Sequence, residues 1–304
     1  MRQIVIAGGS GFIGNALVSH FLQQGDHVIV LSRGRGPERK NLTWCRWDGR
    51  TVGDWSFYLE QADALINLCG RSVDCRYSAK NRKEILESRL FSTRVLGKAV
   101  AACKRPPGVW LQMASATIYR HAEDRPMDEV TGEIGSGFSV DVCQAWEREF
   151  NQLNLPETRK VLMRTSLVLG QKGGALTPLH HLVRFGLGGK QGSGRQMFSW
   201  IHIHDLVRAV EFLLQREQLA GPFNVTAPEP LPNREIMRAL RTVNRRPFGI
   251  SLPVWALEVG AFFIRTETEL ILKSRWVVPK RLTDAGFRFA FPDLKTALSD
   301  ITGR

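Results

Sequence analysis

The chain of 304 residues carries 42 lysines and arginines against 29 aspartates and glutamates, which gives a formal charge of +13. Apolar residues make up 43% and charged residues 23%, ordinary globular proportions that exclude a disordered or fibrous protein and allow one or two domains. Apolar runs stop short of the ~18 residues that a membrane span needs, and we expect no apolar leader before the first predicted strand at Ile4. The five cysteines form no C-x-x-C pair, which favours reduced thiols and a cytoplasmic location.

The positive charge is distributed along the chain and is not gathered in one basic segment. No run of five consecutive basic residues occurs, and no aromatic-interleaved recognition motif accompanies them. We therefore interpret most of the charge as a solvated surface. The expected partner is a small, anionic molecule, with neither nucleic acid nor a membrane.

The first half of the chain alternates short apolar runs with longer helical stretches, the pattern of a parallel sheet covered by helices. Strands are predicted at residues 4–7, 27–31, 64–68, 109–114 and 160–169, and helices at 14–24, 79–103 and 140–153. The strand segments are rich in Val, Ile and Leu, which suits strands buried on both faces.

The second half is less regular. A glycine-rich segment at residues 186–195 precedes a strand at 198–203, a helix at 205–216, a strand at 223–226, a turn at 228–232 and a mainly helical remainder. Asp205 and Asn233 are predicted as N-caps of the helices that they open, because short polar side chains accept bonds from first-turn amides. We expect two parts: residues 1–170 with about 200–227, and a smaller part made of about 171–199 and 228–304.

Three glycines mark the turn between the first predicted strand and the first helix. Gly8, Gly11 and Gly14 follow the spacing G-x-x-G-x-x-G. Glycine at such a turn lets the backbone approach a pyrophosphate, and the helix N-terminus supplies unpaired N–H donors. This context favours dinucleotide binding over a glycine turn without a ligand.

The second predicted strand ends at Ser32-Arg33, where a protein that selects NAD usually has an acidic residue. Ser32 can donate a hydrogen bond, and Arg33 can pair with a 2′-phosphate. Arg33 as an ordinary surface residue remains the alternative. The pair predicts NADP(H) as the cofactor.

Four further motifs give the chain a family resemblance: NLCG at residues 67–70, GSGRQ at 192–196, WIHIHDL at 200–206 and VPKRL at 278–282. Together with the glycine turn, they resemble the extended short-chain dehydrogenase/reductase superfamily, and within it the NAD(P)-dependent epimerase/dehydratase-like subgroup. The resemblance implies an α/β protein with a Rossmann-type doubly wound parallel sheet and a smaller, mainly helical C-terminal substrate domain. It also implies a set of cofactor-binding residues: Gly8, Gly11, Phe12, Ile13, Ser32, Arg33, Leu68, Cys69, Glu84, Arg89 and Leu167. For Glu84 and Arg89, a surface salt bridge is the alternative.

The resemblance also implies a catalytic tyrosine and lysine spaced as Tyr-x-x-x-Lys, and this chain lacks them. Tyr58, Tyr77 and Tyr119 have no lysine four residues later, and alignment places Ser139 and Cys143 at the two positions. A serine hydroxyl and a neutral thiol cannot replace an activated phenol and an ammonium group.

Ser115 and Tyr119 are the remaining candidates for catalysis. Ser115 resembles the family's catalytic serine, and capping the end of its strand is the open alternative. Tyr119 is close to Ser115 in sequence and is the candidate proton donor. We expect any activity to depend on these two residues or on a proton of the substrate itself, and not on Ser139.

Arg195 and His202 are candidates for substrate binding. A guanidinium after the flexible glycine segment can bind a phosphate or carboxylate with two hydrogen bonds. His202 either lines the cleft or is a structural histidine, and its spacing to His204 predicts no metal site. The expected function is an NADP(H)-binding, epimerase- or oxidoreductase-like protein that acts on a small anionic substrate. A non-catalytic NADP(H)-binding redox sensor or regulator is the alternative.

Overall fold

The protein contains a parallel sheet whose strand order places a dinucleotide site at one edge. The structure, a computed structural model, describes residues 1–171, 173, 176–264 and 267–303, so residues 172, 174–175, 265–266 and 304 of the predicted smaller part lie outside the described residues. Within the described part, seven strands pair in parallel in the order β10-β6-β5-β4-β1-β2-β3. Their bounds are β1 Gln3–Ala7, β2 His27–Ser32, β3 Leu42–Arg46, β4 Ala64–Asn67, β5 Val109–Ser115, β6 Arg159–Thr165 and β10 Gly221–Val225.

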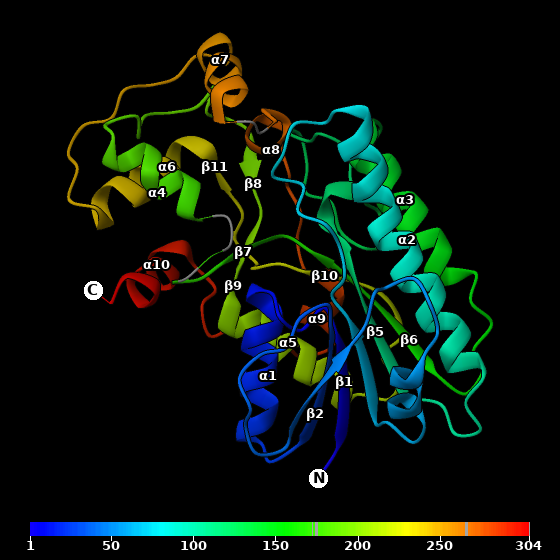
Figure 1. Cartoon of the computed structure of the whole chain (residues 1–304). Coiled ribbons are helices and arrows are strands. Elements are labelled where there is room, and N and C mark those ends of the chain that lie inside the picture. The colour runs from blue at the N-terminus through cyan, green and yellow to red at the C-terminus, as the bar shows by residue number, and fades with distance from the viewer. Residues whose placement is uncertain (172, 174–175, 265–266, 304) are drawn as a thin grey trace.

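Helices cover both faces of this sheet (Figure 1). One face packs against α1 Phe12–Gln23 and α5 Ile203–Gln215, and the other against α2 Ala79–Ala101 and α3 Phe138–Asn151. The central strands carry buried Val, Ile and Leu on both faces, as expected for a sheet between two helical layers. This doubly wound sheet confirms the predicted fold class. Its chain order reverses between β1 and β4, so the carboxyl ends of these strands form the crevice where such sheets bind ligands.

A second, smaller core lies beyond that edge and is mainly helical. It packs residues of α4 Leu176–Arg184, α6 Asn233–Val243 and α10 Leu294–Thr302 around the buried Trp200. Three further helices follow α6 in the chain: α7 Val254–Ile264, α8 Glu269–Leu272 and α9 Lys280–Asp284. Of these, α9 packs against β10, and its Leu282 belongs to the core of the main sheet. Figure 1 shows α4, α6, α7 and α10 grouped beyond the sheet.

Two predicted strands are each divided in the structure. The segment 160–169 forms β6 and then β7 Leu167–Leu169, which leaves the main sheet to pair with β9 Trp200–His202. The segment 198–203 forms β8 Met197–Phe198 and β9, and β8 pairs with β11 Leu231–Pro232 inside the predicted turn. Ser199 separates β8 from β9 because its hydroxyl donates to the carbonyl of Arg275 and accepts from the amide of Val277. The edge strand β3 and helix α4 were not predicted.

Both predicted helix caps are wrong. His202 caps α5 by accepting a bond from the His204 amide at 3.2 Å, and Asp205 lies inside the first turn. The buried Asp205 carboxylate instead accepts bonds from the amides of Ala290 and Phe291, at 2.8 Å each. Asn233 is the first residue of α6 and uses its side chain to bond Gln191. Both side chains that the local sequence predicts as caps therefore bond to groups far away in the sequence instead.

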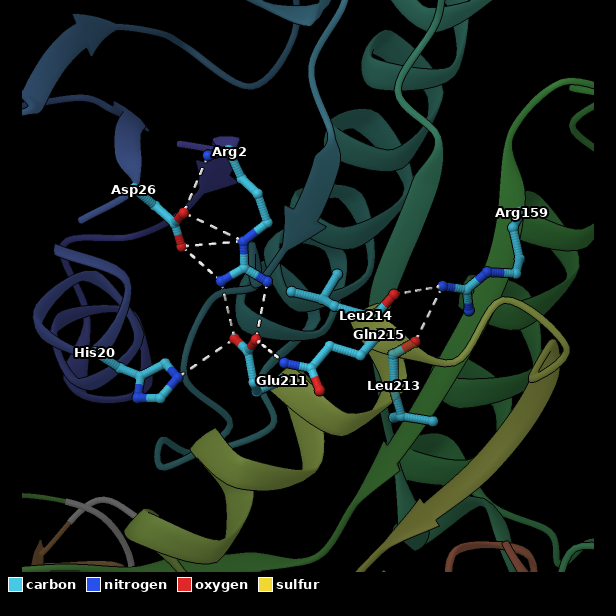
Figure 2. Close-up of polar contacts among 8 residues, drawn as sticks. All are labelled: Arg2, His20, Asp26, Arg159, Glu211, Leu213, Leu214 and Gln215. Carbon is cyan, nitrogen blue, oxygen red and sulfur yellow. Dashed lines mark hydrogen bonds and ion pairs between the residues drawn. The ribbon is translucent and has the colours of Figure 1, made fainter. Parts of the chain in front are cut away.

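Some of the basic residues stabilise the fold through specific contacts and are not part of the solvated charge. In Figure 2, Arg2 joins Asp26, which precedes β2, to Glu211 on α5 at distances of 2.6 and 2.8 Å, and His20 lies 3.4 Å from the same glutamate. Arg159 donates to the last carbonyls of α5, those of Leu213 and Leu214, at 3.0 Å each (Figure 2). These carbonyls have no partner within the helix, so the guanidinium supplies the donors that the helix end lacks.

Candidate active site

The glycine turn brings β1, β4 and α1 into close contact. Gly8 has φ +77°, and a Cβ there would lie 3.1 Å from Cys69 Sγ. A Cβ on Gly14 would lie 2.5 Å from the backbone of Gly9, so the first turn of α1 packs directly on the loop. Larger side chains cannot occupy this arrangement without a backbone shift. Because glycines have no side chain, a ligand at this edge of the sheet can approach the backbone of the loop closely.

The N-terminus of α1 has the donors that a pyrophosphate needs. Gly11 is its N-cap and supplies no side-chain acceptor, and the first turn, which starts with Phe12 and Ile13, carries no acidic residue. The first amides of the helix thus keep their hydrogen-bonding capacity and face no competing negative charge. A dinucleotide phosphate fits this site.

The ends of β2 and β4 supply the neighbouring positions. Ser32 is buried and its hydroxyl donates to the carbonyl of Gly34, while Arg33 is exposed. Burial raises the pKa of the Cys69 thiol to about 12, against the opposing positive charge of Arg33 nearby, so this thiol is neutral. The structure therefore brings Gly8, Arg33 and Cys69 together at the switch point, with Leu68 preceding Cys69. The residues present fit an NADP(H) adenosine phosphate.

Glu84 and Arg89 do not pair with each other, so the predicted alternative of a salt bridge between them is wrong. Glu84 pairs with Arg71. Arg89 donates to the carbonyls of Arg71 and Ile85 at 3.1 and 2.8 Å and lies over the Trp146 ring at 5.1 Å. Both residues stay predicted cofactor contacts, and Leu167 is half-buried at the start of β7.

Ser115 ends β5 and caps the short helical turn Ala116–Ile118 that follows. Its Oγ accepts a hydrogen bond from the Thr117 amide at 3.2 Å. This is the capping role that the sequence left open. The side chain is half-buried, so a second contact through its hydroxyl proton remains available.

Tyr119 belongs to a closed polar network that we call the Arg164 cluster: Arg164, Glu147, Tyr119 and Asn224. The Tyr119 hydroxyl donates to Asn224 Oδ1 and accepts from an Arg164 nitrogen, both at 2.9 Å. Arg164 holds Glu147 through two bonds of 2.8 Å. Burial raises the pKa of the Tyr119 phenol, and only 2% of the residue is exposed. The geometry therefore corrects the choice of Tyr119 as proton donor, because its hydroxyl is already bonded on both sides and enclosed.

A second polar group includes Ser139 of α3, the residue that the family resemblance predicts at the tyrosine position. Ser139 Oγ donates to Glu269 Oε2 at 2.9 Å and lies 3.4 Å from the hydroxyl of Tyr77. With Arg275, which faces both Tyr77 and Glu269 electrostatically, these residues form the group that we call the Tyr77 cluster. Sequence reasoning missed it, because its members come from the segment before α2, from α3, from α8 and from the segment before α9.

Cations gather around the Tyr77 cluster. Lys273 Nζ donates to the Thr117 carbonyl at 2.8 Å, and Arg275 Nε donates to Thr117 Oγ1 at 3.1 Å. Burial lowers the pKa of both Lys273 and Arg275, while burial raises that of the Cys143 thiol to about 11. Cys143 is therefore a neutral, buried neighbour of these cations. These two positively charged side chains favour an anionic ligand.

A cavity of about 710 Å³ adjoins this cluster. Its lining includes Arg120, His121, Ser136, Glu269 and Lys273. Of the Tyr77 cluster, Glu269 lines the cavity, and so does the neighbouring Lys273, so the cavity borders the cluster at its carboxylate.

The two predicted substrate residues lie apart from this arrangement. Arg195 is exposed and lies 3.5 Å from Glu123. His202 is buried, caps α5, stacks on Phe291 at 4.0 Å and lies 3.3 Å from Asp300. His202 is thus the structural histidine of the two alternatives. Arg195 remains a predicted substrate contact.

Comparison with known proteins agrees with the fold and identifies the family. Residues 4–226 match the model of the NAD dependent epimerase/dehydratase family, and residues 252–301 match a domain of unknown function, DUF1731. The epimerase family protein SDR39U1 of Bos taurus is 35% identical over 98% of this chain and 99% of its own length. The epimerase family protein YfhF of Bacillus subtilis is 31% identical over 98% and 97%.

Solved structures extend the comparison. Human epimerase family protein SDR39U1, crystallised with NADPH, has a TM-score of 0.87 to this chain at 30% identity, with 100% of both chains covered. A UDP-N-acetylglucosamine 4-epimerase from Bacillus cereus has a TM-score of 0.77 at 16% identity, over 99% of this chain and 96% of its own, and shares the fold. Among the described residues, no helix is long and apolar enough to cross a membrane.

Proposed function

Since the chain belongs to the NAD-dependent epimerase/dehydratase family, we propose that it binds NADP(H) and acts as an oxidoreductase or epimerase on a small anionic substrate. The turn at Gly8, the first amides of α1 and the Leu68-Cys69 stretch would hold the dinucleotide, with Arg33 at its 2′-phosphate. When bound, the cofactor supplies hydride chemistry beside the carboxyl end of the sheet.

One observation carries the choice of NADP(H) over NAD(H). The end of β2 presents the exposed Arg33 and the buried Ser32, with no acidic residue to bind a ribose 2′-hydroxyl. A guanidinium pairs with a phosphate through charge-assisted hydrogen bonds. The NADPH in the structure of the human relative supports the same choice.

Calorimetry with NADPH and NADH tests this proposal. We expect the wild-type protein to prefer NADPH, and Arg33→Ala to lose about 1–3 kcal/mol of NADPH binding with little effect on NADH. Arg288→Ala, which removes an exposed arginine of the C-terminal region, is the control for a general loss of positive charge. Equal wild-type affinities for the two cofactors would overturn the assignment.

The cations around the cavity support an anionic substrate. Lys273 and Arg120 line it, with Glu269 as the acidic residue among its described lining residues. Arg120 is also paired with Asp124 and Glu133, so Lys273 carries most of this argument. We propose a small molecule as the partner, and neither nucleic acid nor a membrane, because several of the chain's arginines are engaged within the fold. A cytoplasmic location is part of the proposal, on the ground that the five cysteines are unpaired.

A non-catalytic NADP(H)-binding sensor is the second candidate. The observation that favours it is that no tyrosine of the sequence has a lysine four residues later; we propose that Ser139 and Cys143 of α3 stand at the two positions. Such a sensor would bind NADPH and reduce no carbonyl compound. The two candidates therefore differ in turnover and not in cofactor binding.

A further inference from the structure

We infer that the smaller, mainly helical region carries a second anion-binding site, for a compact ligand with two or more phosphate groups. The site is a cavity of about 410 Å³ at the C-terminal end of α6, which we call the arginine cavity. Its described lining residues are Arg238, Arg241, Thr242, Arg245, Arg246 and Pro247. None of these residues belongs to the glycine turn or to the cavity beside the Tyr77 cluster, so the inference is independent of NADP(H) binding.

The pattern of α6 brings positive charge to one side of the helix. Its apolar side, with Met237 and Leu240, is buried in the second core among residues of α4 and α10 (Figure 1). Arg238 and Arg241 lie three residues apart on the helix, and Arg245 comes shortly after its end. Like charges at this spacing repel one another. A bound anion would remove this repulsion, since it attracts each of the guanidinium groups.

The end of α6 is capped without these guanidinium groups. The amide of Arg245 donates to the carbonyl of Thr242 at 3.1 Å. The amide of Arg246 donates to the carbonyl of Arg241 at 2.9 Å, and the two bonds together form a Schellman motif. Arginine side chains near a helix C-terminus can bond its last carbonyls, but here backbone amides already do so. The cap therefore does not explain why two arginines follow the helix.

Arg245 has a backbone conformation that suits glycine and not arginine. Its φ is +53°, in the left-handed region, directly after the cap residue Asn244. Glycine is the usual residue at this position of a Schellman motif because it has no Cβ. An arginine there makes the helix end less stable than a glycine would. Such an outlier points to a use for the side chain other than stability.

Three of the four guanidinium groups have no partner within the part of the chain that the structure describes. The exposed side chains of Arg238, Arg245 and Arg246 form no ion pair or hydrogen bond with a described residue. Arg241 is half-buried and donates to the carbonyl of Gly188. A Cβ on Gly188 would lie 3.0 Å from Arg241 Cγ, so the glycine-rich segment packs closely on this arginine. One fixed arginine thus stands beside three unpaired ones.

This arrangement fits a phosphorylated small molecule. A guanidinium binds a phosphate through two charge-assisted hydrogen bonds, and three unpaired groups can neutralise more charge than one phosphate carries. The volume of the arginine cavity lies near the lower end of the range for ligand pockets, which suits a compact anion. Carboxylates begin only in the adjoining cavity of about 670 Å³, which shares Arg238 and Arg241 and is also lined by Glu229, Glu235 and Asp293. The phosphate groups therefore belong at the arginine end.

Calorimetry with inorganic pyrophosphate as the probe tests the site. In about 0.15 M salt, which screens weak surface attraction, we expect the wild-type protein to bind pyrophosphate. Arg238→Gln and Arg246→Gln should each weaken that binding about tenfold or more, because each removes charge-assisted hydrogen bonds. Their NADPH affinity should equal that of wild type. Arg148→Gln is the matched control, because it removes an exposed arginine in the last turn of α3, and it should bind pyrophosphate as wild type does.

Arg245→Gly separates ligand binding from folding. Glycine tolerates the positive φ, so the variant should have a higher melting temperature than wild type. It should nevertheless bind pyrophosphate about tenfold or more weakly, because the guanidinium is lost. Loss of affinity in this variant therefore cannot come from a damaged fold. A variant that gains stability and keeps full affinity would contradict the inference.

Three other results would overturn the inference. They are no pyrophosphate binding by the folded wild-type protein, unchanged affinity in both Arg238→Gln and Arg246→Gln, and an equal loss in Arg148→Gln, which would indicate general charge attraction. Co-sedimentation with phosphatidylglycerol vesicles and a gel-shift assay with duplex DNA test the size of the ligand. We expect neither to bind when pyrophosphate is saturating. Binding that persists there and is lost in Arg246→Gln would replace the small ligand by a macromolecular one.

Discussion

The Arg164 cluster and the Tyr77 cluster both place a tyrosine beside an arginine and a glutamate, yet their geometry differs. In the Arg164 cluster, the phenol is bonded on both sides and the carboxylate is held by two bonds from the guanidinium. In the Tyr77 cluster, the phenol has one long contact, to Ser139, and it is Glu269, the acceptor of the Ser139 hydroxyl, that lines an open cavity. The comparison teaches that a saturated network stabilises the fold, whereas a partly open one retains capacity for a ligand and a proton.

Breaking the buried ion pair should give the largest effect on stability. Arg164→Met leaves the Glu147 carboxylate, on a residue 8% exposed, without its partner. We expect a loss of about 3–5 kcal/mol in the free energy of unfolding, measured by urea denaturation. The control is Arg94→Met, which removes an exposed pair with Glu149 and should cost about 1 kcal/mol or less. Equal losses in the two variants would contradict the contrast between buried and exposed pairs.

Removing each tyrosine hydroxyl should show the difference between the clusters in stability. Tyr119→Phe leaves Asn224 and Arg164 each short of one buried partner, which should cost about 1–3 kcal/mol of stability. Tyr77→Phe should cost less than that, because its hydroxyl makes one contact of 3.4 Å, to Ser139. Urea denaturation of the two variants measures both losses. Equal losses would remove the distinction between the clusters.

A third polar group surrounds Glu211, whose carboxylate is partly buried between Arg2 and His20 (Figure 2). The pH dependence of stability tests its contribution. Burial alone would raise the pKa of Glu211, but hydrogen bonds from His20 and Arg2 outweigh it and lower the pKa to about 2, from the usual 4.5. The folded state therefore favours the ionised carboxylate. Its stabilising contribution is complete above pH 4.5 and is lost as the pH falls from 4.5 to about 2.

Glu211→Gln should make the melting temperature less dependent on pH in that window. The neutral amide does not titrate, so the part of the acid destabilisation that comes from this group disappears. Glu38→Gln, at an exposed position, is the matched control and should retain the wild-type slope. An unchanged slope in Glu211→Gln would show that the carboxylate contributes nothing to the acid response.

The cofactor edge could be predicted because its signals are contiguous. Three glycines at fixed spacing, a strand before them and a helix after them define one local unit, and Ser32-Arg33 follows at the end of the next strand. Each residue in this unit is constrained by its near neighbours: Gly8 by its backbone angle, and Gly14 by the loop six residues or fewer before it. The alternation of short apolar runs and helical stretches likewise predicted the sheet and the helices that cover it, but it missed the edge strand β3 and was wrong at the segments 160–169 and 198–203, where strands change partners.

The sequence by itself thus determined the doubly wound sheet, the glycine turn and the absence of a Tyr-x-x-x-Lys pair. Only the tertiary structure decided which tyrosine belongs to a closed network and which has a single contact through its hydroxyl, and which carboxylate meets Ser139. Tyr77 and Glu269 are separated from Ser139 by 62 and 130 positions, so no local spacing relates them. Asp205 shows the same principle, since amides 85 and 86 positions away compete with the local cap for its carboxylate. Hydrogen-bond partners of a buried polar group are set by what packs around it, and that is a property of the folded chain.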